Sequence, residues 1–250
     1  CYATAEGGLQ WKKPNLGIID YKGSKENNIV FAGTPERICV GSVSVFADRN
    51  EGGKKKYKMI FGSYPRDRKP VKGLPDVLVY DYSEARWKPT QFWITAAYSE
   101  DGLHWTPGAK PRIVDWYTDT REVAFWDRRI GKYVLFVRWN HLTWDRSIGR
   151  SESADFESFP KPQLVLTPDA LDPEVTGLYN SAAMQYFHAD RAYFLFPSAF
   201  YHTRGSAVAG LPDASEVQIA TSRDGVRFQR PSRKAFLGVG LEGEFDARQV

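Results

Sequence analysis

An all-β fold is predicted by this sequence, and three observations support it. Aromatic residues make up 14% of the 250 residues and hydrophobic residues 42%, a composition that suits β-strands around a large core. A short motif of a β-rich run, a polar turn and an aromatic residue occurs four times, at residues 2–11, 98–105, 149–159 and 219–228. Apolar runs precede the later copies at intervals of tens of residues, which is typical of repeat folds. Together these features predict a β-propeller, in which each repeat is one four-stranded antiparallel blade.

The strands of each blade can be assigned from the repeats. Strand A, the innermost, is predicted at residues 42–46, 122–126 and 181–186, with a fourth copy at 246–250. Strand B is predicted at residues 57–62, 132–137 and 192–196, and strand C at residues 92–98, 147–150 and 217–221. Because a blade takes roughly 50 to 80 residues here, residues 1–250 are expected to form one domain with part of a first blade, three full blades and the start of a further one. This favours a five-bladed ring and an excerpt of a longer protein, and closure with four or six blades stays open.

The lengths of the connections distinguish the two faces of the predicted ring. The turns from strand A to strand B and from strand C to strand D are short and share one face, which we call the turn face. The opposite face, which we call the loop face, carries longer connections such as residues 66–89 and 107–120. Long loops on a rigid scaffold are where sites form, so the functional site is expected on the loop face. Structural roles are expected for the turn-face aspartates, which recur in turns: Asp48, Asp101, Asp127 and Asp224.

Charge and cysteine content bear on the function classes. The net charge is +4, and the densest basic run, residues 54–58, follows two glycines in what reads as a solvated hairpin turn. A nucleic-acid partner therefore gains little support. No apolar run approaches the roughly 18 residues of a membrane helix. Cys1 and Cys39 form neither a metal motif nor a disulfide framework. No cofactor is expected, and a structural calcium ion is left open.

Polar residues stand at the start of strand A, where the blades converge on the axis of the ring. Burying a charged pair such as Arg121 and Glu122 there costs free energy, unless water solvates the charges or they take part in the function of the protein. One interpretation is an ion pair that plugs the channel. The other is a pocket in which Glu122 and Asp246 face each other. Carboxylates that could supplement them are Asp119, Glu174, Glu242 and Glu244. Glycoside hydrolysis needs one protonated and one ionised carboxyl group about 5 to 10 Å apart, so Glu122 and Asp246 are the candidate catalytic residues.

The loop face also offers side chains suited to a sugar. Residues 138–146 and 201–204 supply aromatic faces for pyranose rings, and Arg and His donors for hydroxyl, carboxylate or sulfate groups. The candidate substrate-binding residues are Arg121, Arg138, Trp139, His141, Tyr179, Asn180, His202 and Arg204. The two histidines lack a spaced partner, so no metal site is predicted. No Ser-His-Asp order, Gly-rich phosphate loop or paired Cys motif occurs in the sequence.

Residues 120–137 read Thr-Arg-Glu-Val-Ala-Phe-Trp-Asp-Arg-Arg-Ile-Gly-Lys-Tyr-Val-Leu-Phe-Val. This segment resembles the inner blade of the five-bladed glycosidases of families 32, 43, 68, 117 and 130, where an Arg-Asp-Pro motif precedes a similar strand and a Gly-Lys turn. Residues 1–11, 146–159, 178–202 and 242–250 are similar to bacterial secreted propellers described as glycoside-hydrolase-like. The resemblance spans nearly the whole chain.

The resemblance implies roles for particular positions. Glu122 takes the place of the second-blade Asp that orients the substrate and tunes the acid in those enzymes, with Arg121 beside it. The chain departs from the family pattern in several places: Glu122 replaces Asp, Val123 replaces Pro, Ser42 stands where an Asp is expected, and Asn180 stands where a general-acid Glu is expected. The base is left open between a segment preceding this sequence and Asp246.

Three functions follow as alternatives. The resemblance implies a secreted or periplasmic glycoside hydrolase acting on an oligo- or polysaccharide. A non-catalytic carbohydrate-binding propeller is the alternative from another class. A sialidase is the third, because the repeated turns resemble Asp boxes. Those boxes read Ser-x-Asp-x-Gly-x-x-Trp, one residue longer between Asp and Gly than residues 98–105, which makes this alternative the weakest.

Overall fold

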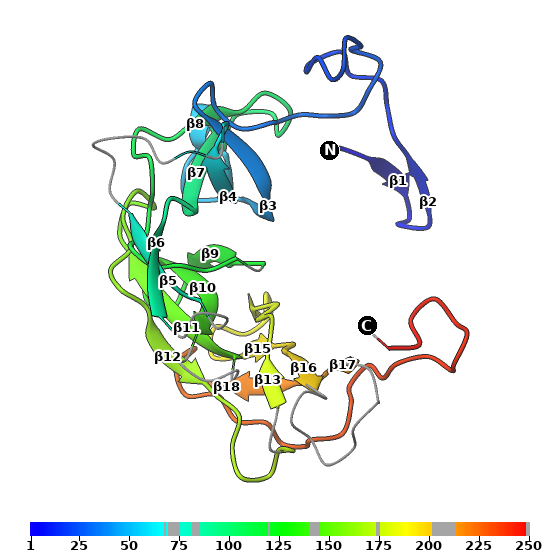
Figure 1. Cartoon of the computed structure of the whole chain (residues 1–250), viewed down its shortest axis with the longest axis vertical. Coiled ribbons are helices and arrows are strands. Elements are labelled where there is room, and N and C mark those ends of the chain that lie inside the picture. The colour runs from blue at the N-terminus through cyan, green and yellow to red at the C-terminus, as the bar shows by residue number, and fades with distance from the viewer. Residues whose placement is uncertain are drawn as a thin grey trace.

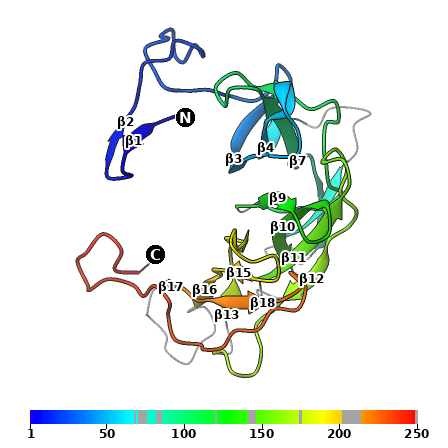
Figure 2. The ribbon, with the colours of Figure 1, turned by 180° about the vertical axis from the view of Figure 1, so that it is seen from behind.

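The computed structural model describes the chain except residues 68, 70–75, 82–85, 120, 141–145, 174–175, 202–213 and 249–250. Within that part the regular structure is β-strand, with one short 3-10 helix, η1 (Gly53–Lys55), and no α-helix. No helix in the described ranges is long and apolar enough to cross a membrane. The sheets follow one another around an open arc, and the two chain ends lie on either side of its opening (Figures 1 and 2). The prediction of an all-β fold is confirmed.

Two blades are four-stranded antiparallel sheets, as predicted. The first blade has the strand order β3 (Arg37–Ala47), β4 (Tyr57–Pro65), β7 (Trp93–Ser99), β8 (Thr106–Pro107). The second blade has the order β9 (Val123–Asp127), β10 (Lys132–Asn140), β11 (Arg146–Ser153), β12 (Gln163–Leu166). In both, the first strand faces the middle of the arc and the last lies farthest out (Figure 1). This arrangement of sheets is consistent with a propeller.

The third blade is divided into two three-stranded sheets. Strand β13 (Thr176–Leu178) pairs with β16 (Ser198–Tyr201), and β16 pairs with β17 (Ala214–Val217). Strand β14 (Met184–Gln185) pairs with β15 (Tyr193–Leu195), and β15 pairs with β18 (Ala220–Ser222). Pro197 separates β15 from β16, because it has no amide hydrogen for the ladder. The inner strand is shorter than predicted, since Ala182 has a left-handed backbone with φ 37°.

Two hairpins accompany the blades. The N-terminal hairpin consists of β1 (Thr4–Glu6) and β2 (Gln10–Lys12), and it matches the first copy of the repeated motif. A second hairpin, β5 (Val77–Asp81) with β6 (Arg86–Thr90), lies in a connection that the sequence indicated only as a long loop. The long connection of the first blade therefore has regular structure of its own.

The fourth strand A, expected at residues 246–250, is not formed in the described residues. The amide of Gly240 donates to the carbonyl of Asp246 at 3.0 Å, and the amide of Ala247 donates to the carbonyl of Glu244 at 3.2 Å. These backbone groups close local turns instead of pairing with a neighbouring strand. Residues 246–248 therefore form no strand, and residues 249–250 of the predicted strand lie outside the described residues.

The hydrophobic core lies between the blades, and β10 shows how. Leu135 belongs to a buried cluster with Ile94 of the first blade, whereas Phe136 belongs to another with Leu195 of the third blade. Side chains on a strand alternate between its two faces. The continuous apolar run of β10 therefore fills two interfaces at once, which is why its sequence shows no clear polar alternation.

The short turns lie together, as predicted. Lys55 Nζ, in the turn after β3, lies 3.3 Å from Glu157 Oε1, in the turn after β11. Arg129, in the turn after β9, donates to the backbone oxygen of Asp224, in the turn after β18, at 2.7 Å. The A-to-B and C-to-D turns of neighbouring blades therefore share the turn face.

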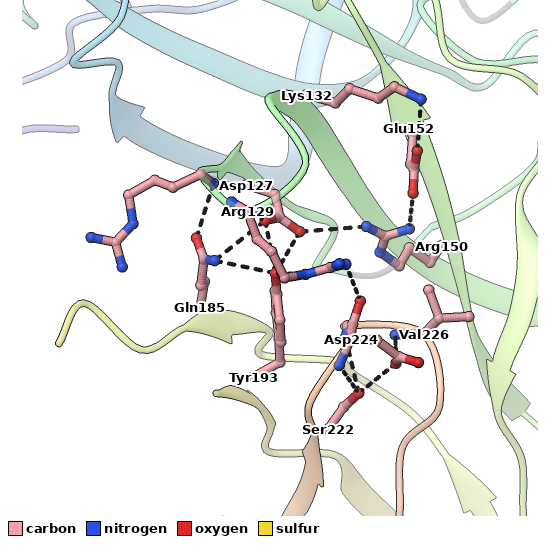
Figure 3. A network of polar contacts seen from close by, with 12 residues as sticks. Asp127, Arg129, Lys132, Arg150, Glu152, Gln185, Tyr193, Ser222, Asp224 and Val226 are labelled. Atoms are coloured by element: carbon pink, nitrogen blue, oxygen red, sulfur yellow. Dashed lines mark hydrogen bonds and ion pairs between the residues drawn. The ribbon is translucent and has the colours of Figure 1, made fainter. Parts of the chain in front are cut away.

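A polar contact, which we call the Asp–Tyr clip, repeats between neighbouring blades at the turn face. Tyr133 Oη, at the start of strand B in the second blade, donates to Asp48 Oδ2 of the first blade at 2.5 Å. Tyr193 Oη of the third blade donates to Asp127 Oδ1 of the second at 2.7 Å. Both aspartates are buried. Figure 3 shows the second clip, where Arg150 also lies beside Asp127, with 3.7 Å between Nη2 and Oδ2. The structural roles predicted for Asp48 and Asp127 are confirmed.

The repeated turns are closed by their own side chains. Asp224 Oδ1 accepts hydrogen bonds from two following backbone amides at 2.9 and 2.8 Å, and Ser222 Oγ donates to it at 2.9 Å (Figure 3). The same arrangement occurs at Ser99 with Asp101 and at Ser153 with Asp155. The backbone amides lower the pKa of Asp155 and of Asp224. The structural roles predicted for Asp101 and Asp224 are confirmed.

Candidate functional site

The loop-face end of the second blade gathers most of the candidate residues that the structure describes. Glu122 directly precedes β9, Arg138 and Trp139 lie near the end of β10, and Tyr179 and Asn180 follow β13. Arg138 Cζ lies 5.3 Å from the centre of the Tyr179 ring. The fold therefore brings candidates from the second and third blades to one place.

Glu122 is the titratable group of this cluster with the largest change in acidity. The residue is 1% exposed. Its Oε1 accepts a hydrogen bond from Thr118 Oγ1 at 2.8 Å, whereas its buried Oε2 has no hydrogen-bond partner in the described part of the chain. Burial raises the pKa of Glu122 to about 8, opposed by the hydroxyls of Thr118 and Ser42 and assisted by the charge of Asp119. Glu122 therefore carries a proton at neutral pH.

The neighbouring Arg121 is exposed and does not pair with Glu122. Among the ion pairs of the described residues, none joins these two side chains. The ion pair at this end of the strand is formed instead by Arg138 Nη2 and Asp119 Oδ1, at 2.6 Å. The interpretation of Arg121 and Glu122 as an ion pair that plugs the channel is therefore wrong. Burial keeps the Glu122 carboxyl neutral, and the Arg121 side chain is exposed to solvent.

Aromatic rings border the charged pair. The rings of Trp116 and Trp139 have centroids 4.6 Å apart and an interplanar angle of 36°. Trp116 Nε1 donates to the carbonyl of Arg138 at 3.1 Å. Arg146 Cζ lies 4.8 Å from the centre of the Tyr179 ring. Aromatic faces next to guanidinium groups can bind the apolar faces and the oxygens of a sugar.

The third blade adds buried polar atoms. Asn180 Nδ2 donates to Ser198 Oγ at 3.5 Å, while Asn180 Oδ1 and Ser181 Oγ are buried and have no hydrogen-bond partner within the described ranges. Buried polar groups in proteins are ordinarily paired with protein or water. Together with Glu122 Oε2, these atoms are suited to contact water or a ligand at the inner ends of two neighbouring blades.

Asp246 is separate from this cluster in its contacts. Its carboxylate lies against its own turn, so that a side chain at Gly240 would collide with Oδ1. The segment is held to the third blade by the amide of Ser215, which donates to the carbonyl of Arg248 at 2.8 Å. No hydrogen bond or ion pair between described residues joins Asp246 to Glu122. The expected facing pair is not among these contacts.

The remaining candidates His141, His202 and Arg204, and the supplementary Glu174, lie outside the described residues. Elsewhere in the chain, the described residues contain no group of three or more His, Cys, Asp or Glu placed to hold a metal ion.

Sequence reasoning missed two residues of the cluster, Trp116 and Thr118. Both belong to residues 116–119, which read Trp-Tyr-Thr-Asp and lead from the first blade into the second. The dense mixture of aromatic and polar residues shortly before Glu122 is the signal that would have pointed to them.

No protein-family model matches the chain, and no curated protein is significantly similar to it. Solved structures do resemble it. A crystal structure of an N-acetylgalactosamine deacetylase from F. plautii, in complex with blood group B trisaccharide, matches with a TM-score of 0.51 and 14% identity, over 85% of this chain and 74% of that one. At this identity the similarity concerns the overall fold.

Two further structures are similar over much of the chain. A β-1,2-mannobiose phosphorylase from Listeria innocua, in complex with β-1,2-mannobiose, matches with a TM-score of 0.49 and 12% identity, over 86% of this chain and 64% of that one. Zg3597, a family 117 glycoside hydrolase of the marine bacterium Zobellia galactanivorans, matches with a TM-score of 0.45 and 17% identity, over 89% of this chain and 61% of that one. The chain thus spans less than two thirds of each of these two proteins.

Proposed function

We propose that the protein is a glycan-active five-bladed β-propeller, and specifically a glycoside hydrolase in which Glu122 is the proton donor. The observation that carries the proposal is the buried carboxyl of Glu122 at the loop face, whose pKa is raised by burial to about 8. A glycosidase acid must hold its proton at the working pH, and an apolar or enclosed position is how proteins achieve this. The ion pair of Arg138 with Asp119 and the ring pair of Trp116 with Trp139 supply the sugar-binding surroundings.

Hydrolysis also requires an ionised carboxylate, and we assign it to Asp246. In support, the C-terminal segment that carries Asp246 continues the arc beyond the third blade and borders its hollow middle, which the inner strands of the blades face (Figure 2). Substrate contacts are assigned to Arg121, Arg138, Trp139, Tyr179 and Asn180, together with His141, His202 and Arg204.

The test is hydrolysis of a broad panel of oligo- and polysaccharides by the wild type and by Glu122→Gln and Asp246→Asn. Each variant is expected to lose at least about 100-fold in kcat, since general acid–base groups contribute about 10² to 10⁴. Glu100→Gln, at an exposed position on the turn face, is the matched control and should keep full activity. An unchanged kcat in both Glu122→Gln and Asp246→Asn would contradict the hydrolase proposal.

A second candidate function is glycan binding without hydrolysis, and the separate position of Asp246 favours it. Hydrolysis needs two carboxyl groups about 5 to 10 Å apart, whereas the carboxylate of Asp246 lies against its own turn and no hydrogen bond or ion pair between described residues joins it to Glu122. On this alternative, glycan-array binding persists in Glu122→Gln, and the wild type cleaves no glycan of the panel. Binding that is lost in Trp139→Ala while hydrolysis is absent throughout would favour this second candidate over the first.

We also propose that the protein acts outside the cytoplasm, as a secreted or periplasmic protein, because its sequence resembles bacterial secreted propellers. Fractionation of the source cells, followed by immunodetection of the protein, tests this. Recovery in the cytoplasmic fraction alone would contradict it.

A further inference from the structure

We propose that Thr118 is a positioning residue that fixes the acidic proton of Glu122 on Oε2 and so directs it toward a ligand oxygen. The inference rests on the proposed function of Glu122 as a proton donor. It assigns a role to a buried threonine that lies in the connection between the first and second blades.

The hydrogen bonds of Thr118 determine the direction of its hydroxyl. The backbone N–H of Arg138 donates to Thr118 Oγ1 at 3.1 Å. A backbone N–H can only donate, so Thr118 Oγ1 accepts in this bond. Thr118 is 0% exposed, and its single hydroxyl hydrogen needs an acceptor inside the protein. Among the described residues, the acceptor that it meets is Glu122 Oε1, at 2.8 Å.

The direction of that hydroxyl decides which oxygen of Glu122 bears the proton. Since Oε1 accepts from Thr118, a protonated Glu122 carries its hydrogen on Oε2. This oxygen is buried and has no partner among the described residues, although the hydroxyl of Ser42 lies close enough to affect the acidity of the carboxyl. A buried O–H without an acceptor is unfavourable, so Oε2 is suited to donate to an oxygen that a ligand brings when the site opens.

In the proposed reaction this acceptor is the glycosidic oxygen. The O–H bond of Glu122 Oε2 breaks and its hydrogen forms the O–H of the leaving alcohol, while the glycosidic C–O bond breaks with its electron pair going to that oxygen. Water forms the new C–O bond at the sugar carbon and releases one proton to the ionised carboxylate, which is assigned to Asp246. Glu122 becomes a carboxylate, and the Thr118 hydroxyl, already directed at Oε1, stabilises the charge as it forms.

The charged groups around Glu122 act on it differently. Asp119, on the same connection, disfavours the carboxylate and is paired with Arg138 of β10. Arg121 points to solvent, and Ser42 of β3 is uncharged. Thr118, which lies in the connection between the first two blades, thus donates a hydrogen bond that favours the carboxylate form of Glu122. Loss of this hydrogen bond is expected to raise the pKa of Glu122 further.

The experiment is a pH titration by NMR of the protein labelled with ¹³C at the glutamate side-chain carboxyls, with Glu122→Gln assigning the resonance. Thr118→Val should raise the pKa of Glu122 by about one unit, a tenfold change in the protonation equilibrium. Thr118→Ser, which keeps the hydroxyl, should restore the wild-type value. Thr118→Ala provides the same loss of a donor if the valine variant does not fold.

Thr95→Val is the matched control, because Thr95 is also buried and also makes two hydrogen bonds, one to the carbonyl of Pro111 and one with Ser63. It should leave the titration of Glu122 unchanged. An unchanged pKa in both Thr118→Val and Thr118→Ala, or an equal shift in Thr118→Ser, overturns the inference. If the shift appears while Glu122→Gln retains hydrolysis of every cleaved glycan, the proposed function fails and the role of Thr118 in holding the proton stands.

Discussion

Lys58 is a cation enclosed by aromatic rings in the interface between the first and second blades. Its side chain is 0% exposed, its Nζ lies 2.9 Å from Asp48 Oδ2, and it also pairs with Glu51. The ring centres of Tyr98 and Tyr133 lie 5.6 and 5.3 Å from Nζ. The Lys58 ammonium, the Asp48 carboxylate and the two tyrosine rings stabilise one another, so removing any one of them is expected to destabilise the others in the folded protein.

Lys58→Met is expected to lower the free energy of unfolding by about 3 to 5 kcal/mol, because it leaves the buried carboxylate of Asp48 without its cation. Urea denaturation at neutral pH measures the change. Lys132→Met is the control: Lys132 pairs with Glu152 at 3.1 Å, but its side chain is 48% exposed. That substitution should cost less than about 1 kcal/mol. Equal losses in the two variants would contradict the interpretation.

At the scale of the residue, the sequence identified Glu122 but not Thr118. A carboxylate at the start of an apolar strand is conspicuous, because burying it is costly. A threonine in a loop is not, since loops contain many hydroxyls and only the folded backbone brings one of them to a particular oxygen. The turns at residues 246–248 were not predicted for a related reason, because the sequence of residues 246–250 suits a strand and the turns depend on hydrogen bonds within residues 240–248.

At the scale of the element, the repeated turns differ in one respect that can be tested. Gly102 and Gly225 occupy the same turn position with left-handed backbones, φ 79° and 72°. A Cβ at Gly225 would lie 3.1 Å from the Tyr193 ring, whereas at Gly102 the nearest atom of Tyr57 is 3.9 Å away. Phe156, φ 61°, shows that a side chain is accepted at this position where its neighbours leave room.

Both alanine substitutions, Gly102→Ala and Gly225→Ala, should cost about 1 kcal/mol for the left-handed backbone. Gly225→Ala should cost about 1 kcal/mol more, because Tyr193 must move and Tyr193 forms an Asp–Tyr clip. Thermal and urea unfolding of the pair measure the difference. Identical losses would show that the contact with Tyr193 is relieved without cost.

Strand types were more predictable than strand limits. The repeats located strands A to C of the first two blades, because their apolar runs are bounded by turns. The third blade departs from the pattern at Pro197 and Ala182, where a missing amide hydrogen and a left-handed backbone interrupt pairing. The hairpin of β5 and β6 was missed, because periodicity alone does not distinguish a short hairpin from a long loop.

At the scale of the whole molecule, Glu122 makes stability depend on pH. Folding raises the pKa of Glu122 from the ordinary 4.5 to about 8. Between these values the folded protein holds a proton that the unfolded chain has released, so rising pH lowers the free energy of unfolding by about 1.4 kcal/mol per unit. The contribution of this group is fully present below its unfolded pKa and is lost as pH rises through its folded pKa.

Urea denaturation of the wild type and Glu122→Gln between about pH 5 and pH 8 tests this linkage. The glutamine variant, which cannot ionise, should lose the downward slope, so that the two stability curves diverge as pH rises. Carboxylates with lowered pKa values, such as Asp48 and Asp224, act below this window, and their contribution is lost as pH falls. Parallel curves would show that Glu122 titrates in the folded protein as it does in the unfolded chain.

The position of the Asp–Tyr clips affects how the sequence of this protein can evolve. Each clip ties a blade to its neighbour at the face opposite Glu122, and the self-closed turns lie on that same face. The alignment of the blades is thus secured where no candidate substrate contact lies. Insertions and substitutions in the loop-face connections can accumulate without loosening the contacts between the blades, so selection can alter the loop face independently of folding.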